Sequence, residues 1–307
     1  MTAVTPQAIA STADLFLLVF VLVDDLYRAH VPDDVRLRRG HARMTLSDPE
    51  VLTLSLMQEA LSVDSERAFV RRVRRDHAAL FPGLADRSRY HRRRKALVDV
   101  QRTLFARLAA RLSAEAAWLL VDSAPVETVK VERSQTGARS VPEAAYGYRS
   151  VRHQLFFGFR LHVVVSDTGA VVDFALAPAN EPERGVAAAL LGGVEPAVVL
   201  ADAGYDGRPF RDAVAERGHA AWALPKRSHP APDAESKAWR RWVRRRRGLV
   251  EAVFAMLADQ FGIERTRARS VLGIWTRVVS KVLAFDLGIY INGLVGRPPL
   301  AVKSLYS

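Results

Sequence analysis

The chain has 307 residues, of which 49% are hydrophobic and 25% are charged, and it carries a net charge of +12 at pH 7. This composition is that of a globular protein with a substantial core, and the length suggests about two domains. Because the sequence contains no cysteine, disulfides, thiol catalysis and cysteine metal sites are excluded. The basic balance predicts an anionic partner, and nucleic acid is the first candidate.

Residues 1–115 are expected to be helical. The apolar run at residues 15–23 has no basic segment before it and is too short to span a bilayer, so it predicts a buried helix rather than a signal peptide or a membrane anchor. The Ser-Asp-Pro-Glu sequence at 47–50 is a capping box that starts a helix. Further helices are expected from about residue 64 and over residues 88–112.

Basic side chains gather in two segments. Residues 66–95 hold eleven Lys or Arg against three acids, and residues 237–247 hold seven Lys or Arg and no acid. Such clusters release counterions from phosphates, so both segments are expected to contact DNA. We expect Trp239 and Trp242 to pack rather than to stack on bases. Short basic helices suit a helix-turn-helix module, although no recognition helix is identifiable. The arginines predicted to contact DNA are Arg71, Arg72, Arg74, Arg75, Arg92, Arg93, Arg94, Arg244, Arg245 and Arg247.

After residue 115 the pattern changes to strands that alternate with helices. Residues 118–123 form a short apolar run typical of a strand covered on both faces, and a polar loop is expected from there to about residue 154. Residues 156–178 alternate around an Asp-Thr-Gly turn, which predicts a hairpin. The order that follows is helix, strand, helix, strand and a long helix over residues 234–261. This order predicts a mixed α/β sheet with helices packed on it.

Two aspartates, Asp122 and Asp202, share one local context, because each ends an apolar strand and precedes small or turn-forming residues. One such aspartate alone is more often a turn former. If the two strands are parallel neighbours, both carboxylates lie at the same edge of the sheet. Neighbouring carboxylates repel each other unless a cation lies between them. Mg²⁺ or Mn²⁺ is the natural cation at oxygen ligands, and two ions about 4 Å apart support phosphodiester chemistry.

A third acid is expected to complete the metal site, and Glu251 on the long helix is the leading candidate. The alternative for Glu251 is an i,i+4 pair with Arg247, which is worth little energetically. His162 and Tyr205 are candidate auxiliary residues; the alternatives are a structural histidine and a tyrosine that anchors the turn. Asp206 is a weaker metal candidate, because an aspartate flanked by glycines usually builds a turn.

Taken together, these motifs resemble those of the DDE transposases of bacterial insertion sequences, which have an RNase H-like catalytic fold. The matching sequences are LLVDSAPV, the hairpin segment from YGYRSVRH to FALAP, VVLADAGYDG and RRGLVEAVFAML, within residues 116–290. The resemblance implies that Asp122, Asp202 and Glu251 are the metal-binding catalytic triad. It also implies Mg²⁺-dependent hydrolysis at transposon ends and attack of the freed 3′-hydroxyl on target DNA.

The chain departs from one large branch of this family, which surrounds its glutamate with a tyrosine, an arginine and a lysine. The corresponding positions here are Arg244, Arg247 and Ala258, so only the arginine matches. Arg247 is expected to contact a phosphate or to pair with Glu251. The family's acid after the Pro-Ala-Asn turn corresponds to either Glu181 or Glu183, and the sequence leaves both open.

We therefore expect a helical, DNA-binding domain at residues 1–115, an RNase H-like catalytic domain at 116–294 and a tail at 295–307. The predicted protein is a cytoplasmic bacterial transposase, associated with the nucleoid when on DNA and without membrane contact. It would use Mg²⁺ or Mn²⁺, as two ions, and pair the DNA ends as a homodimer. The alternatives are another RNase H-like nuclease or resolvase, and a non-catalytic DNA-binding regulator or transposase remnant.

Overall fold

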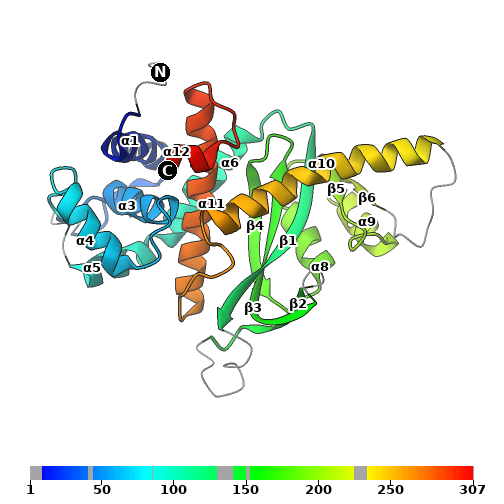
Figure 1. Cartoon of the computed structure of the whole chain (residues 1–307), viewed down its shortest axis with the longest axis horizontal. Coiled ribbons are helices and arrows are strands. Elements are labelled where there is room, and N and C mark those ends of the chain that lie inside the picture. Colours follow the sequence, from blue (N-terminus) through cyan, green and yellow to red (C-terminus); the bar gives the residue numbers. More distant parts are fainter. Residues whose placement is uncertain are drawn as a thin grey trace. The chain divides into compact units, whose positions relative to one another are not determined.

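A computed structural model of the chain describes residues 9–40, 44–84, 86–129, 141–149, 153–224 and 234–306. The chain divides into two compact units (Figure 1). The first, Met1–Leu108 with Asp259–Ser307, is discontinuous in sequence, and the second is Ala109–Ala258. No helix in the described part of the chain is both long and apolar enough to cross a membrane.

The first unit is built from helices, as the periodicity of its sequence predicts. Its centre is α3, which is buried over almost its whole length and packs against α1, α5 and α11. The predicted capping box starts this helix, because the Glu50 amide donates to Ser47 Oγ at 3.3 Å and the Glu50 carboxylate accepts from the Ser47 amide. The helices are α1 (Thr12–His30), α2 (Asp33–Arg36), α3 (Asp48–Ala60), α4 (Glu66–Asp76), α5 (Arg87–Ala96), α6 (Val98–Leu112), which runs into the second unit, α11 (Val271–Leu294) and α12 (Val302–Tyr306).

One expectation for the helices is wrong in detail. The single helix expected over residues 88–112 is two helices, α5 and α6, separated at Leu97, where the backbone leaves helical geometry. Turning the chain there buries both Leu97 and Val98. The C-terminal segment carries a short helix, α12, which packs on α11, and the Tyr306 hydroxyl donates to the Ala284 carbonyl at 2.8 Å.

The second unit contains a six-stranded mixed sheet. Its strands are β1 (Trp118–Val129), β2 (Ala145–Arg149), β3 (Gln154–Ser166), β4 (Val171–Pro178), β5 (Val198–Ala201) and β6 (Ala220–Ala223). The predicted hairpin is confirmed as β3 and β4, and β3 also pairs antiparallel with β1 and β2. On the other side of β1, strands β5 and β6 run parallel to it. The expected mixed α/β sheet is thus confirmed.

Helices cover both faces of this sheet, as Figure 1 shows. On one face, α8 (Glu183–Leu191) and α9 (Arg208–Ala215) enclose an apolar core with Leu119, Val121 and Val164 of the sheet. On the other face lies α10 (Ala234–Asp259), whose Arg246 is 5.9 Å from the ring centre of Trp118. Successive side chains of β1 point to opposite faces of the sheet, so Leu119 and Val121 face α8 and α9 while Trp118 faces α10. An antiparallel part made of β1 to β4, a parallel part made of β5 and β6 beside β1, and flanking helices are consistent with the expected RNase H-like fold.

The expectation of a loop from residue 124 to about residue 154 is wrong in part, because β1 continues to Val129 and β2 follows at Ala145–Arg149. Asp122 therefore lies inside a strand rather than at its end. Polar residues and Pro125 interrupt the apolar run there, and they hide the strand from a pattern based on hydrophobicity. The rest of the expected loop, residues 130–140 and 150–152, lies outside the described residues.

The division into units also differs from the expected domain boundary at residue 294. Contacts group α11 with the N-terminal helices of the first unit. The physical reason is that α11 is buried along most of its length and carries two cations, Arg277 and Lys281, that pair with Glu59 of α3. A pattern of apolar residues does not reveal which partner such a helix packs against.

Candidate active site

The two aspartates lie at the same edge of the sheet. Strands β1 and β5 pair in parallel through Leu119 with Val199 and Leu120 with Leu200. Asp122 and Asp202 each follow two residues after the last of these pairs. The prediction that the two strands are parallel neighbours is confirmed, and their shared register puts both acids where the two strands part.

Asp122 is a carboxylate with both oxygens engaged. Its Oδ1 accepts a hydrogen bond from the Ser123 amide at 2.8 Å, and its Oδ2 lies 3.3 Å from Nη2 of Arg247 on α10. Burial raises the pKa of Asp122 to about 6, against the ordinary value of 3.8. The Ser123 hydrogen bond and the Arg247 charge oppose this rise in pKa, while the charges of Asp202 and Glu183 add to it. The carboxylates are therefore close enough to repel one another.

Asp202 is held in a tight turn immediately after β5. Its Oδ1 accepts from the Gly204 amide at 2.7 Å, and its carbonyl accepts from the Tyr205 amide at 3.1 Å. A Cβ atom at position 204 would lie 2.9 Å from Asp202 Oδ1. Glycine at 204 thus lets the backbone amide approach the carboxylate, and this contact fixes the orientation of Asp202.

Glu183, which the sequence left open, lies beside these acids. It is the first residue of α8, and its carboxylate accepts from Ser123 Oγ at 2.8 Å. Arg160 of β3 lies 3.4 Å from the same carboxylate. Glu181 is exposed. Ser123 and Arg160 were not predicted as site residues. Their positions in the sequence could have suggested them, because Ser123 directly follows Asp122 and Arg160 alternates with buried residues of the hairpin.

Glu251 is exposed on α10, and the structure does not bring it into contact with Asp122 or Asp202. Arg247, one helical turn earlier, pairs with Asp122 and not with Glu251. Within the described ranges, no group of three or more His, Asp or Glu side chains is close enough to hold a metal ion.

The two auxiliary candidates are both buried. His162 is fully buried, and neither of its ring nitrogens has a hydrogen-bond partner among the described residues. Burial lowers its pKa to about 4, which favours the neutral ring. The Tyr205 ring lies 5.3 Å from that of Phe210 in the core beside α8 and α9. Burial raises the pKa of Tyr205, and the nearby acids add to this. Its burial suits an anchor of the turn, because a buried ring presents no open face to a base.

The predicted DNA-contacting arginines of the first unit fall into two groups. On α4, Arg71, Arg74 and Arg75 are exposed and Arg72 is half-buried. Of the three predicted arginines on α5, Arg92 is exposed and the other two are not. Arg93 pairs with Asp48 at 2.6 Å, and Arg94 is buried against Gln58 and Glu59.

On α10, the predicted arginines also differ from one another. Arg244 and Arg245 are exposed, whereas Arg247 is held by Asp122. Between them, Arg246 stacks 3.7 Å over the ring centre of Trp242, which packs edge-on against Trp222. The interpretation of Trp242 as a packing residue agrees with these contacts.

Comparison with known families gives one match. The family model described as "Transposase DDE domain" matches residues 117–287, which is more than half of the chain. The matched segment contains Asp122, Asp202 and Glu251. No curated protein and no solved structure matches the chain.

Proposed function

This chain belongs to the family of transposases with a DDE domain, and we propose that it cleaves the ends of a mobile DNA element and joins them to target DNA. The observation that carries the proposal is the matched position of Asp122 and Asp202 after the parallel pair of β1 and β5. Open α/β sheets bind their ligands at this edge. Acids held together there are costly to a fold, so their presence favours a catalytic role.

The residues present suit a divalent cation in their donor chemistry. Asp122 and Asp202 supply carboxylate oxygens. Burial raises the pKa of Asp122, the charges of Asp202 and Glu183 add to the rise, and a bound cation would oppose both effects. Mg²⁺ is usually held by one or two carboxylates together with substrate phosphates, so two protein ligands are sufficient. When bound, Mg²⁺ or Mn²⁺, as two ions, supplies activation of a water or hydroxyl and stabilisation of the leaving oxygen.

Neighbouring residues set the orientation and the charge balance of the two carboxylates. The Gly204 amide orients Asp202, and the Ser123 amide orients Asp122. Arg247 balances the charge of Asp122 from α10. We propose Glu251 as the third acid of the triad, with Glu183 as the competing candidate because its charge already acts on Asp122.

DNA is the proposed partner, and the excess of cations supports it. The exposed arginines of α4 and α10, together with Arg92, are proposed to contact phosphates. Two transposon ends must be brought together for joining, so we propose that a homodimer forms on the DNA.

The test is cleavage and joining of DNA that carries the element's ends, with Mg²⁺ or Mn²⁺ present. We expect Asp122→Asn, Asp202→Asn and Glu251→Gln each to abolish cleavage and to leave DNA binding largely intact. Full activity in one variant would remove that residue from the triad. The exposure of Glu251 favours one second candidate, a DNA-binding protein without catalysis. This second candidate predicts DNA binding with no cleavage by the wild type.

A further inference from the structure

The first unit contains a cavity of about 510 Å³ that is separate from the aspartate site. It is formed by the start of α4, one side of α5, the first two turns of α11 and the segment that precedes α11. Its lining carries seven Lys or Arg side chains and only two carboxylates, Asp64 and Glu66. The cavity is therefore strongly cationic, and its volume is in the range that holds a nucleotide-sized ligand.

Four of these cations have no acidic partner among the residues that the structure describes. Arg267 pairs with Asp64 at 3.0 Å, and Arg94 and Arg277 pair with acids of the same unit. Among the residues that the structure describes, no ion pair or hydrogen bond engages the side chains of the remaining four. These are Arg67, Arg87, Lys95 and Arg269.

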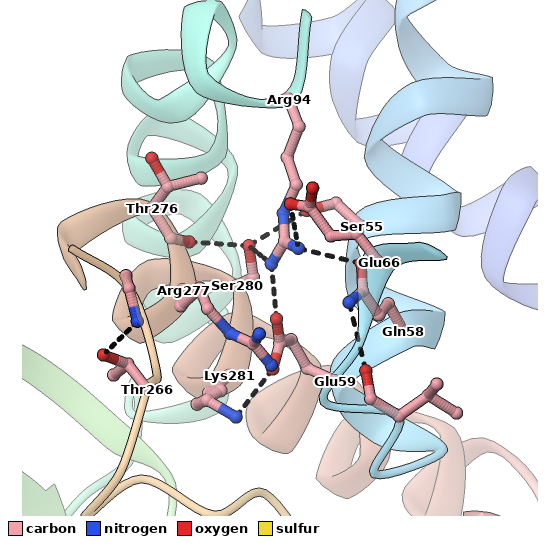
Figure 2. Close-up of polar contacts among 12 residues, drawn as sticks. Ser55, Gln58, Glu59, Glu66, Arg94, Thr266, Thr276, Arg277, Ser280 and Lys281 are labelled. Carbon is pink, nitrogen blue, oxygen red and sulfur yellow. Dashed lines mark hydrogen bonds and ion pairs between the residues drawn. The ribbon is translucent and has the colours of Figure 1, made fainter. Parts of the chain in front are cut away.

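Two buried arginines line the same cavity. Arg94 is 1% exposed and Arg277 is 8% exposed, and in the described part of the chain the buried Nε atom of each has no hydrogen-bond partner. Figure 2 shows both guanidinium groups, with Lys281, directed at the single carboxylate of Glu59. Glu66 lies 3.6 Å from Arg94, and Asp64 lies 3.9 Å from Arg277. Because the lining holds further cations, positive charge stays in excess beside the cavity.

The backbone adds to this field. Ser65 and Ser270 line the cavity and cap α4 and α11, and Arg87 opens α5. The positive ends of three helix dipoles therefore border the cavity, and helix N-termini attract anions. These helix ends, the four cations without an acidic partner in the described residues and the two buried Nε atoms together suit the binding of a phosphate group.

We propose that this cavity binds a phosphodiester of the DNA backbone, with Arg67, Arg87, Lys95 and Arg269 as its contacts. The inference rests on the proposed function, because it takes DNA as the source of the phosphate. It adds Arg269, from the C-terminal part of the chain, to a DNA surface that the sequence assigned only to earlier segments. A free nucleotide or inorganic phosphate shares the same chemistry, and the experiment separates these sources.

The experiment compares two double variants that lose the same charge. Arg87→Ala with Arg269→Ala changes two exposed cavity residues, and Arg39→Ala with Arg107→Ala changes two exposed arginines of the same unit outside the cavity. Binding to a short labelled duplex is followed by fluorescence anisotropy between about 50 and 200 mM salt. The cavity variant should weaken binding about tenfold and lower the salt slope by about two, and the control should change both much less. Equal effects of the two variants would overturn the inference.

Two further arms complete the test. Arg87→Lys with Arg269→Lys keeps both charges and should retain most of the salt slope, so a general loss of folding is recognised. A mononucleotide or inorganic phosphate that binds the wild type tightly, and that duplex DNA does not displace, would overturn DNA as the source. If the cavity variant weakens DNA binding but the wild type cleaves no DNA, the proposed function is refuted and the cavity site is not. If the wild type cleaves DNA and the cavity and control variants bind DNA equally well, the cavity site is refuted and the proposed function is not.

Discussion

Nη2 of Arg247 lies 3.3 Å from Oδ2 of Asp122, and this ion pair joins α10 to the sheet at the candidate active site. The contact explains why Arg247 does not pair with Glu251, its neighbour one turn along the helix. It also gives Asp122 a positive partner that lowers its pKa against the effect of burial. The charge state of the site therefore depends on α10 as well as on the strands.

Replacing Arg247 with alanine should raise the pKa of Asp122 above its value of about 6, because a favourable charge is lost. The measurement is an NMR titration of the Asp122 carboxyl in metal-free protein. Arg244→Ala is the matched control, since Arg244 is exposed on the same helix. A pKa that rises equally in both variants would mean that net charge, rather than the ion pair, sets the titration.

Asp122→Asn should change the pH dependence of stability. The pKa of Asp122 is about 6 in the fold against 3.8 ordinarily, so the folded protein binds this proton more tightly. The resulting stabilisation is full below about pH 4 and is lost as pH rises through about 6, on the order of 3 kcal/mol in total. Relative to the wild type, the variant should therefore gain about this much free energy of unfolding between about pH 4 and pH 8. Urea unfolding in the presence of EDTA measures it, and a pH-independent difference would contradict it.

Glu183→Gln should lower the pKa of Asp122, because it removes a negative charge that raises it. Glu181→Gln is the control, since Glu181 is exposed two residues away. The same NMR titration reports both variants. If Glu181→Gln lowered the pKa of Asp122 as much as Glu183→Gln, the placement of Glu183 beside the aspartates would be contradicted.

Glu59→Gln should destabilise the helical unit strongly. Glu59 is fully buried, and although burial raises its pKa, the charges of Lys281, Arg94 and Arg277 hold that pKa well below the usual range. Removing the carboxylate takes away the acidic partner of Lys281 and leaves Arg94 and Arg277 with the more distant Glu66, at 3.6 Å, and Asp64, at 3.9 Å. Breaking buried ion pairs in this way costs about 3–5 kcal/mol. Urea unfolding measures the loss, with the exposed Asp34→Asn as control. A loss no larger than that of the control would show that the cluster does not depend on Glu59.

Much of the fold could be predicted from the sequence because its signals are local. The capping box at Ser47 and the hairpin of β3 and β4 depend on neighbouring residues. The parallel pairing of β1 with β5 followed from two matched apolar runs that end in acids. The extension of β1 through Pro125 and the division between α5 and α6 were missed, because tertiary packing decides them.

The site was harder to predict because charge partners come from distant segments. Arg93 and Arg94 belong to one basic run, yet contacts with Asp48 and Glu59 of α3 make them part of the helical unit's interior ion pairs. The position of Glu183 beside Asp122 depends on how α8 packs on the sheet. A run of arginines shows the presence of charge but does not show which charges reach solvent.

The most direct test of the central claim is binding of Mn²⁺ to the purified protein, followed by calorimetry or electron paramagnetic resonance. We predict that the wild type binds the ion and that Asp122→Asn and Asp202→Asn each weaken binding by more than about tenfold. Asp206→Asn, in the same loop but beside Arg211, should keep wild-type affinity. Wild-type affinity in both Asp122→Asn and Asp202→Asn would contradict the claim that these two aspartates form the metal-binding pair.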